Sequence, residues 1–279
     1  MQIYNSLDEV VEAGSIAPDS IINADCLEAM KFIPDKSIDC IICDLPYGVT
    51  ACKWDIVIPF DLLWEQYKRI IKPNGAIVLF GSQPFTSALV MSNPKWFKYE
   101  WIWEKTCATG FLDANKKPLK NHENILIFYH KSPRYNPQKQ KGEPYIKKRR
   151  TPDRAVIYNQ VRGPLTINKG SRYPKTVLPM ANGNYKSPHP TQKPVALIEY
   201  LLKTYTLENE LILDNTAGSG TLAIAAINTN RRYICIEKDP GYFEVMRDRI
   251  ESHDPNALAA PKKARKPKAI PEGQLRLFG

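Results

Sequence analysis

The chain has 279 residues, of which 43% are hydrophobic and 24% charged, and its formal net charge is +10. This composition supports a sizeable buried core and excludes wholesale disorder. No uncharged apolar stretch approaches the roughly 18 residues of a membrane span, and the acidic N-terminal segment does not resemble a signal peptide. We therefore exclude a membrane protein, a coiled coil, a collagen and a disulfide-rich mini-domain, and expect one large domain or one domain with an insertion.

Apolar runs and helical patterns alternate along the chain. Buried strands are predicted at 37–43, 76–80, 211–213 and 233–236. Helices are predicted between them at 59–71, 194–205 and 218–228. Two later strands, with an antiparallel arrangement, are expected at 99–104 and 124–130. The alternation predicts an α/β fold whose mostly parallel sheet is covered by helices.

The six cysteines are scattered through the sequence, which indicates a reduced, cytoplasmic protein. Cys40 and Cys43 form a CxxC pair, which raises the question of a metal site. They lie in the predicted strand 37–43, where residues three apart face opposite sides of the sheet. No second CxxC follows. A buried strand is therefore favoured over a zinc site, and no metal is expected.

The positive charge is concentrated in residues 131–186. This segment holds fourteen Lys or Arg residues and two acids, together with seven prolines and five tyrosines, and shows little periodicity. It is either a solvated loop or a nucleic-acid-binding insertion, because Lys and Arg neutralise phosphates and Tyr can stack on bases. Composition alone does not choose between them. The tail from 253 to 279 is rich in Pro, Ala and Lys and is expected to be disordered.

A small-residue loop follows the predicted strand 211–213. The strand runs into Asp214, and a helix is expected directly after the loop, so backbone N–H groups at the helix start are open to a ligand. Glu237 ends the next strand, where an acid is placed to bind a ribose diol. The segment predicts an adenosine-containing cofactor, although an ordinary tight turn or a dinucleotide fold would look similar.

The tetrapeptide Asp44-Leu45-Pro46-Tyr47 follows another predicted strand, 37–43. Asp44 and the Leu45 carbonyl can accept hydrogen bonds from an exocyclic amine, Pro46 fixes the turn, and Tyr47 offers a flat face for stacking. These are the requirements of a site that binds a planar amine beyond the carboxyl end of a parallel strand. A strand ending in a proline turn with a core tyrosine is the alternative.

A third segment, His189-Pro-Thr-Gln-Lys-Pro194, lies just before the predicted helix 194–205. Thr191 and Gln192 can bind polar groups, and Lys193 can pair with a carboxylate. The alternative is a helix start that uses proline at its first position.

Together these segments resemble the S-adenosylmethionine-dependent amino-methyltransferases of DNA. Asp-Leu-Pro-Tyr resembles the family's catalytic D-P-P-Y motif, Asp-Asn-Thr-Ala-Gly-Ser-Gly resembles its D-P-F-A/M-G-S-G cofactor loop, and the His189–Pro194 segment matches the usual upstream partner. Their order resembles the permuted β class, and the similarity covers roughly residues 20–250. Leu45 replaces a proline, and Asn215-Thr216 replace Pro-Phe, so a stacking contact with the cofactor is expected to be lost or rebuilt.

The resemblance implies a class I, Rossmann-like methyltransferase fold: a doubly wound, mostly parallel sheet with an antiparallel last strand and a basic insertion. The implied parts are a catalytic half, a target-recognition insertion, a cofactor-binding half and a basic tail: 20–130, 131–186, 187–252 and 253–279. The implied catalytic residues are Asp44, Leu45, Pro46 and Tyr47. The implied cofactor-binding residues are Asp25, Cys26, His189, Thr191, Gln192, Lys193, Asp214, Thr216, Ala217, Gly218, Ser219, Gly220, Thr221 and Glu237. The implied DNA-binding residues are Lys147, Lys148, Arg149 and Arg150.

The resemblance also implies the activity, a site-specific methyl transfer within a restriction–modification system. The substrate is double-stranded DNA with the target base flipped out of the helix. Adenine N6 is preferred over cytosine N4 as acceptor, because in this family an Asp-led motif goes mostly with adenine. An RNA or glutamine methyltransferase and a catalytically silent DNA-binding protein are the remaining alternatives; the intact Asp44 argues against the glutamine enzyme and the silent protein.

Partners and location follow from the same resemblance. We expect a cytoplasmic, nucleoid-associated enzyme, and members of this group are often homodimers. The C-terminal peptide from Gln274 to Phe278 resembles the segment by which bacterial proteins dock on the replication sliding clamp, where two leucines and an aromatic residue fill an apolar groove. A chance apolar end that packs on its own domain is the alternative.

Overall fold

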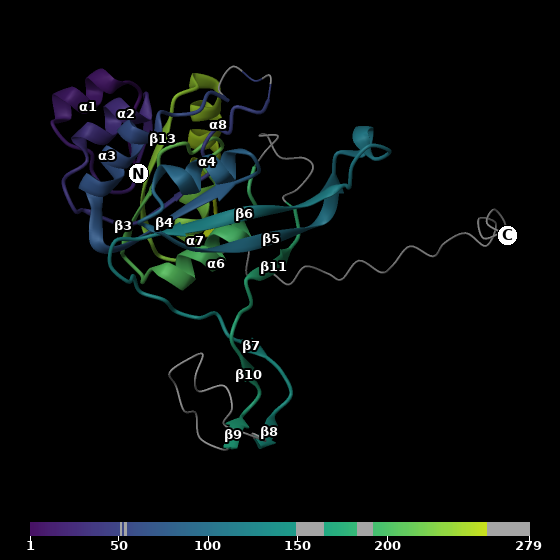
Figure 1. Ribbon diagram of the computed structural model, residues 1–279. Coiled ribbons are helices and arrows are strands. Elements are labelled where there is room, and N and C mark those ends of the chain that lie inside the picture. The colour runs from purple at the N-terminus through teal and green to yellow at the C-terminus, as the bar shows by residue number, and fades with distance from the viewer. Residues whose placement is uncertain (51, 53–54, 149–164, 183–191, 256–279) are drawn as a thin grey trace.

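The computed structural model describes residues 1–50, 52, 55–148, 165–182 and 192–255. Its centre is a nine-stranded sheet (Figure 1). The strands follow the order β1-β2-β13-β12-β3-β4-β6-β5-β11 across the sheet. Their bounds are β1 Gln2–Tyr4, β2 Ser20–Asn23, β3 Ile38–Cys43, β4 Ile71–Gly81, β5 Phe97–Thr109, β6 Lys120–Phe128, β11 Val177–Met180, β12 Leu211–Asp214 and β13 Arg232–Glu237.

The sheet is parallel except at β6, which pairs antiparallel with both β4 and β5. The predicted α/β fold with a mostly parallel sheet is therefore confirmed, but the antiparallel strand, expected to be the last, lies between β4 and β5. The buried runs predicted from the sequence lie within β3, β4, β12 and β13. Cys40 and Cys43 are buried on β3 on opposite faces of the sheet. No cluster of metal-ligating side chains occurs within the described ranges.

Helices cover both faces of the sheet, as a doubly wound fold requires. One face packs against the first four α-helices and the other against the last three, in two separate apolar clusters. The helix bounds are α1 Leu7–Ala13, α2 Cys26–Ala29, α3 Phe60–Ile70, α4 Phe85–Ser92, α6 Val195–Tyr205, α7 Thr221–Asn228 and α8 Pro240–Glu251, with short 3₁₀ turns η1 Met30–Phe32 and η2 Phe111–Asp113. No described helix is long and apolar enough to cross a membrane.

The helix predicted at 59–71 is α3, which ends at Ile70 and leads directly into β4. β4 begins at Ile71, and its pairing with β3 is irregular between Ile38 and Cys40. Proline has no N–H to donate to a strand partner, so it is accommodated where the regular pairing is interrupted. Pro73 therefore lies in the irregular first part of β4, just after the end of the predicted helix.

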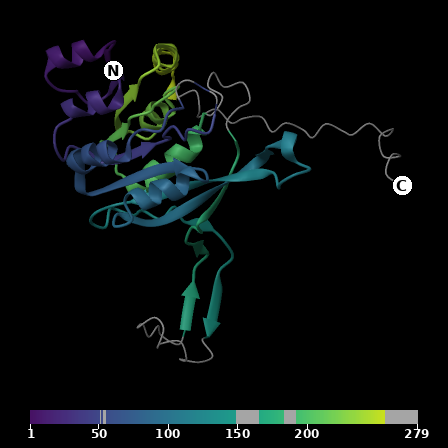
Figure 2. The same ribbon diagram turned by 45° about the horizontal axis from the view of Figure 1, so that its top comes forward.

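The basic segment 131–186 contains strands that the sequence did not reveal. β7 (Gln140–Lys141) pairs with β10 (Ser171–Arg172), and β8 (Tyr145–Lys148) pairs with β9 (Leu165–Asn168). These pairs form an arm that extends from the body of the protein (Figures 1 and 2). The sequence analysis left a solvated loop and a nucleic-acid-binding insertion open here and predicted no strands, because pairs of two to four residues are too short to show a period.

The segment also returns to the central sheet. β11 runs parallel to β5, with Val177 opposite Ile102 and Met180 opposite Lys105. The arm itself has little core: the Arg172 guanidinium lies 4.7 Å from the ring centre of Tyr145 and donates to the Glu143 carbonyl. The arm is thus a basic extension whose last strand belongs to the sheet.

Candidate active site

The catalytic corner, residues 44–47, begins where β3 ends. The Tyr47 hydroxyl donates a hydrogen bond to Asp44 Oδ1 over 2.7 Å. The Tyr47 ring stacks on Phe85 of α4, with centroids 4.9 Å apart and planes inclined by 27°. Burial and the neighbouring Asp44 raise the pKa of Tyr47 well above its ordinary value. The phenol therefore stays protonated and keeps donating to Asp44.

A buried cluster under this corner explains one of the two departures from the family pattern. The side-chain oxygen of Asn215 accepts hydrogen bonds from the Tyr67 hydroxyl of α3, at 2.6 Å, and from Cys43 Sγ, at 2.8 Å. The Asn215 backbone N–H donates to Cys43 Sγ. Asn215 therefore ties the cofactor loop to β3. In the sequence, Asn215 could be recognised only as a departure from the Pro-Phe of the family motif.

The loop after Cys52 closes back on the corner through Asp55, another residue that sequence reasoning missed. The Asp55 carboxylate accepts hydrogen bonds from the backbone N–H groups of Gly48, Val49 and Thr50, at 2.7 to 2.9 Å. Burial opposes the charge, but these hydrogen bonds hold the pKa of Asp55 below its ordinary value. An ionised Asp55 thus fixes the backbone directly after Tyr47.

The cofactor loop, residues 214–220, lies between β12 and α7. Thr216 Oγ1 donates to the Asp44 backbone carbonyl at 3.1 Å, which joins this loop to the catalytic corner. Gly220 has φ +75°, and a Cβ there would lie 2.6 Å from Met246 Cγ, so both conformation and space require glycine.

Arg249 of α8 holds the same loop in place, and sequence reasoning missed it. Its Nη1 donates to the Ser219 carbonyl at 2.9 Å, to Ser219 Oγ at 3.1 Å and to Thr221 Oγ1 at 3.2 Å. Ser219 Oγ in turn donates to Gln192 Oε1 at 2.8 Å. Gln192 therefore contacts the cofactor loop, as its assignment to the cofactor site requires.

Glu237 ends β13 and faces the cofactor loop. Its Oε2 accepts the Gly218 N–H at 2.7 Å, and its Oε1 accepts the Asp239 N–H at 2.8 Å. Asp25, at the start of α2, accepts the Leu27 N–H at 2.9 Å and pairs with Lys238 at 3.0 Å. Both carboxylates keep lone pairs for a ligand, because each oxygen can accept more than one hydrogen bond.

One cavity of about 610 Å³ joins these parts. It is lined by the catalytic corner, by the cofactor loop from Asp214 to Ser219, and by Asp25, Cys26 and Glu237. The two segments that resemble the catalytic motif and the cofactor loop therefore line one cavity. Its described lining contains seven carboxylates and two lysines. Burial raises the pKa of Asp214 to about 7, with Asp44 and Glu237 adding to the effect, so the cavity is suited to a cationic ligand.

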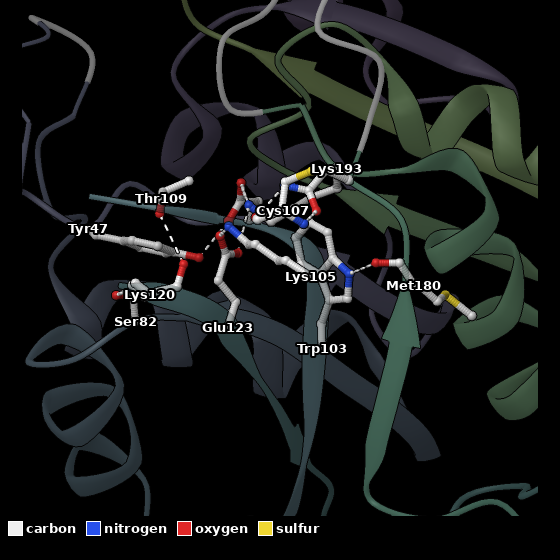
Figure 3. Close-up of polar contacts among 12 residues, drawn as sticks. Tyr47, Ser82, Trp103, Lys105, Cys107, Thr109, Lys120, Glu123, Met180 and Lys193 are labelled. Atoms are coloured by element: carbon white, nitrogen blue, oxygen red, sulfur yellow. Dashed lines mark hydrogen bonds and ion pairs between the residues drawn. The ribbon is translucent and has the colours of Figure 1, made fainter. Parts of the chain in front are cut away.

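Lys193 pairs with carboxylates, as the sequence analysis allowed. Its Nζ donates to Asp44 Oδ2 and lies 3.3 Å from Glu123 Oε2 of β6, and the residue lines the same cavity. Figure 3 shows that the polar ends of the Lys193, Glu123, Lys105 and Tyr47 side chains lie in one cluster. Sequence reasoning missed Glu123 and Lys105. No signal in the sequence singled them out, because β5 and β6 carry other charged residues close by, Glu104 and Lys120 among them.

Some predicted site residues lie outside the described residues: His189, Thr191, Arg149 and Arg150. Lys147 lies exposed on β8 of the arm, and Lys148 follows it on the same strand. Cys26 is buried beside Asn215, and burial raises the pKa of its thiol to about 11. A neutral thiol of this kind has no nucleophilic role, which agrees with a direct transfer.

A family model described as DNA methylase matches residues 38–248, and the chain belongs to this family, the N6/N4 DNA methyltransferases. It is 28% identical over 245 residues to the type II methyltransferase M.HpaI of Haemophilus parainfluenzae, covering 83% of this chain and 74% of that protein. It is 27% identical over 274 residues to the type II methyltransferase M.HinfI of Haemophilus influenzae, covering 85% and 69%.

Solved structures agree with this family. The complex of M1.HpyAVI with SAM superposes with a TM-score of 0.57 at 25% identity, over 82% of this chain and 98% of that one. The cytosine-N4-specific PvuII DNA methyltransferase superposes with a TM-score of 0.62 at 14% identity, over 88% and 91%, which shows a shared fold. The chain is thus a DNA methyltransferase, and the fold, family and cofactor class predicted from the sequence are confirmed.

The residues present fit S-adenosylmethionine. Glu237 has free acceptor capacity for a ribose diol, and the buried Asp214 carboxylate has no cation partner among the described residues. A ligand that carries an ammonium and a sulfonium would supply the missing positive charge.

Proposed function

We propose that the protein transfers a methyl group from S-adenosylmethionine to the N6 amine of adenine in double-stranded DNA. The observation that carries the proposal is the Asp44 carboxylate, held by Tyr47 in the cavity that also contains the cofactor loop. The Asp-led motif favours adenine over cytosine. The N4 amine of cytosine is the alternative, because its geometry makes similar demands on the same acceptors.

S-adenosylmethionine supplies a methyl group bonded to a positively charged sulfur. Glu237 is proposed to bind its ribose, Asp25 its adenine end and Asp214 its ammonium group. Gln192 and Ser219 hold the loop beside it. The predicted contacts of His189 and Thr191 belong to the same site and lie outside the described residues.

The target amine is a weak nucleophile, because its lone pair is delocalised into the aromatic ring. Hydrogen bonds from the amine to Asp44 and to the Leu45 carbonyl favour a pyramidal nitrogen with its lone pair directed at the methyl group. The bound cofactor would supply its methyl group directly to this nitrogen. The N–C bond would form as the C–S bond broke, the electron pair would stay on sulfur, and one N–H proton would pass to water. Positioning is the main contribution of the protein to such a step.

The target base has to leave the duplex to reach Asp44. Tyr47 is proposed to stack on it, with Phe85 fixing the tyrosine ring.

The basic arm is proposed to bind DNA phosphates through Lys147 and Lys148, together with Arg149 and Arg150, and to carry the recognition of sequence. The enzyme would then work in the cytoplasm on nucleoid DNA, as its type II relatives suggest.

Mass spectrometry of nucleosides tests the acceptor. DNA from a host without methyltransferases is incubated with the protein and the cofactor, and is then digested to nucleosides. N6-methyladenine is the expected product; N4-methylcytosine without N6-methyladenine would overturn the choice of base. Single-molecule sequencing of the same DNA reports the recognition site.

Two partner proposals remain from the sequence. The peptide from Gln274 to Phe278 lies outside the described residues, and we propose it as a sliding-clamp ligand; removing residues 274–279 should abolish clamp pull-down. A homodimer is proposed because members of this group are often homodimers. Sedimentation of the full chain, with and without DNA, tests this proposal.

A further inference from the structure

A buried chain of charges runs from the central sheet to the catalytic acid. Lys105 of β5 donates to Glu123 Oε1 of β6, and Glu123 Oε2 faces Lys193 at 3.3 Å. Lys193 in turn donates to Asp44 Oδ2. Figure 3 shows Lys105, Glu123 and Lys193 in this succession.

The first three members of this series are buried, and Asp44 at its end is partly exposed toward the cavity. The side chains of Lys105 and Glu123 are each 13% exposed, and that of Lys193 is 9% exposed. The rings of Trp103 and Phe80 lie against the two lysines, at 4.9 and 5.2 Å from the ammonium groups. Removing three charges from water is costly and does not by itself stabilise a fold, so a functional reason for the arrangement has to be sought.

The two oxygens of Asp44 are held from opposite sides. Tyr47 donates to Oδ1 and Lys193 to Oδ2. A carboxylate accepts about four hydrogen bonds in all, so Asp44 keeps acceptor capacity for a substrate amine while its plane is fixed. Lys193 comes from the segment before α6 and Asp44 from the end of β3, and the contact of Lys193 with Glu123 restricts where its ammonium can lie.

We propose that Glu123 is a positioning residue for methyl transfer: it holds Lys193 so that Lys193 orients the Asp44 carboxylate toward the target amine. Glu123 acts through Lys193, and Lys105 holds Glu123 in turn. The proposal rests on the proposed function, but it holds for either acceptor base, because both present an amine to Asp44.

The first test is Glu123→Gln, which keeps the shape and removes the charge. We expect a fall of about 100-fold in the single-turnover rate at saturating DNA, as is usual when reacting groups are misplaced by about 1 Å. The KM for DNA and the Kd for S-adenosylmethionine should stay unchanged. Glu104→Gln, an exposed neighbour of Lys105, is the matched control and should behave as wild type.

A double variant separates positioning from charge balance. Lys105→Met/Glu123→Gln removes one charge of each sign and leaves no uncompensated buried lysine from this pair. If Glu123 only balances charge, the double variant recovers the wild-type rate, and the proposal is overturned. If Glu123 positions Lys193, the double variant stays slow while its melting temperature recovers. The double variant also decides the question if Glu123→Gln alone fails to fold.

The pH dependence of the rate gives an independent readout. Lys193 is faced by Asp44 from the catalytic corner and by Glu123 and Lys120 from β6. Tyr47 reaches it through Asp44, and Lys105 of β5 through Glu123. Burial lowers the pKa of Lys193, but Asp44 and Glu123 together raise it above its ordinary value.

Loss of Glu123 removes one of these two carboxylates. The alkaline limb of the single-turnover rate should therefore move to lower pH in Glu123→Gln than in wild type. An alkaline limb that coincides with that of wild type, or a wild-type rate in Glu123→Gln, overturns the proposal. If wild-type protein methylates neither base, the proposed function fails instead, and this result is obtained before any variant is compared.

Discussion

The side chain of Thr216 donates a hydrogen bond to the backbone carbonyl of Asp44 at 3.1 Å, across 172 residues of sequence. The two residues meet because β12 and β3 are parallel neighbours, with Ile212 opposite Cys40 and Leu213 opposite Ile41. Parallel neighbours end at the same edge of a sheet, so the loops that follow them form one site. This contact places the corner proposed to bind the amine beside the loop proposed to bind the cofactor.

Replacing the catalytic acid should separate binding from transfer. Asp44→Ala removes the acceptor for the target amine, and we expect the single-turnover rate to fall by about 100-fold or more. Binding of DNA and of the cofactor should be largely kept, because the arm and the cofactor loop are untouched. Filter binding and transfer of a radiolabelled methyl group measure the two effects. Persistent transfer would contradict the site assignment, and Asp61→Ala, on the exposed start of α3, serves as control.

The affinity for S-adenosylmethionine should depend on pH through Asp214. Burial raises the pKa of this carboxyl to about 7, and a cationic ligand binds the ionised form. The affinity should therefore fall as pH drops below 7, approaching about tenfold per pH unit. Calorimetric titration across this range measures it. Asp214→Asn should bind more weakly at pH 8 and lose this dependence; an equally steep dependence in the variant would assign it to another group.

The same carboxyl should affect the stability of the cofactor-free protein. Its pKa is raised in the folded state from 3.8 to about 7, so the stabilisation that it contributes is present below 3.8 and is lost as pH rises to 7. Asp214→Asn keeps an oxygen for the Thr216 N–H and removes the charge. We expect the variant to melt at a higher temperature than wild type at pH 8 and to lose this advantage at acid pH. Thermal unfolding followed by circular dichroism measures the difference.

Glu237 should control cofactor affinity rather than the rate of transfer. Its two oxygens organise the N–H groups of Gly218 and Asp239 and face the proposed ribose position. Glu237→Ala loses both contacts and the diol acceptor, and each hydrogen bond to a charged group contributes about 1.5–3 kcal/mol. We expect a loss of cofactor affinity with a nearly normal rate at saturation. Glu251→Gln, exposed at the end of α8, is the control; a rate defect that saturating cofactor does not correct would argue for a catalytic role.

The arm should contribute to DNA affinity through charge. Lys147 is exposed on β8, and Lys147→Ala should weaken binding of all DNA sequences alike and reduce the salt slope of log K by about 1. The transfer rate at saturating DNA should stay normal. Fluorescence anisotropy at several salt concentrations measures the slope, with Lys95→Ala as a control outside the arm. An unchanged slope would remove Lys147 from the DNA-contacting set.

Much of the candidate site could be predicted from short sequence motifs. The Asp44–Tyr47 corner and the cofactor loop each combine a strand end with residues that few other sites need together, and their order along the chain identified the family. The alternation of apolar runs with helical patterns predicted the layers, because burial on both faces leaves strands continuously apolar. For this reason β3, β4, β12 and β13 were found where they were predicted.

Three features depended on contacts between distant segments. Lys193 pairs with Asp44 and Glu123 because β6 and the segment before α6 meet at the end of β3, and no spacing in the sequence encodes that meeting. The arm strands were missed because their pairs are short and exposed, with no periodicity to detect. Asn215, seen in the sequence only as a departure, is the buried link between the cofactor loop and Tyr67.

The amino-acid sequence alone determined the fold class, the family and the two loops that carry the chemistry, because these rest on local patterns of burial and on motifs a few residues long. Tertiary structure decided which charged groups face the catalytic acid and how the basic segment is built. Those features depend on side chains brought together by the order of strands in the sheet, and ion pairs across such distances leave no local signal.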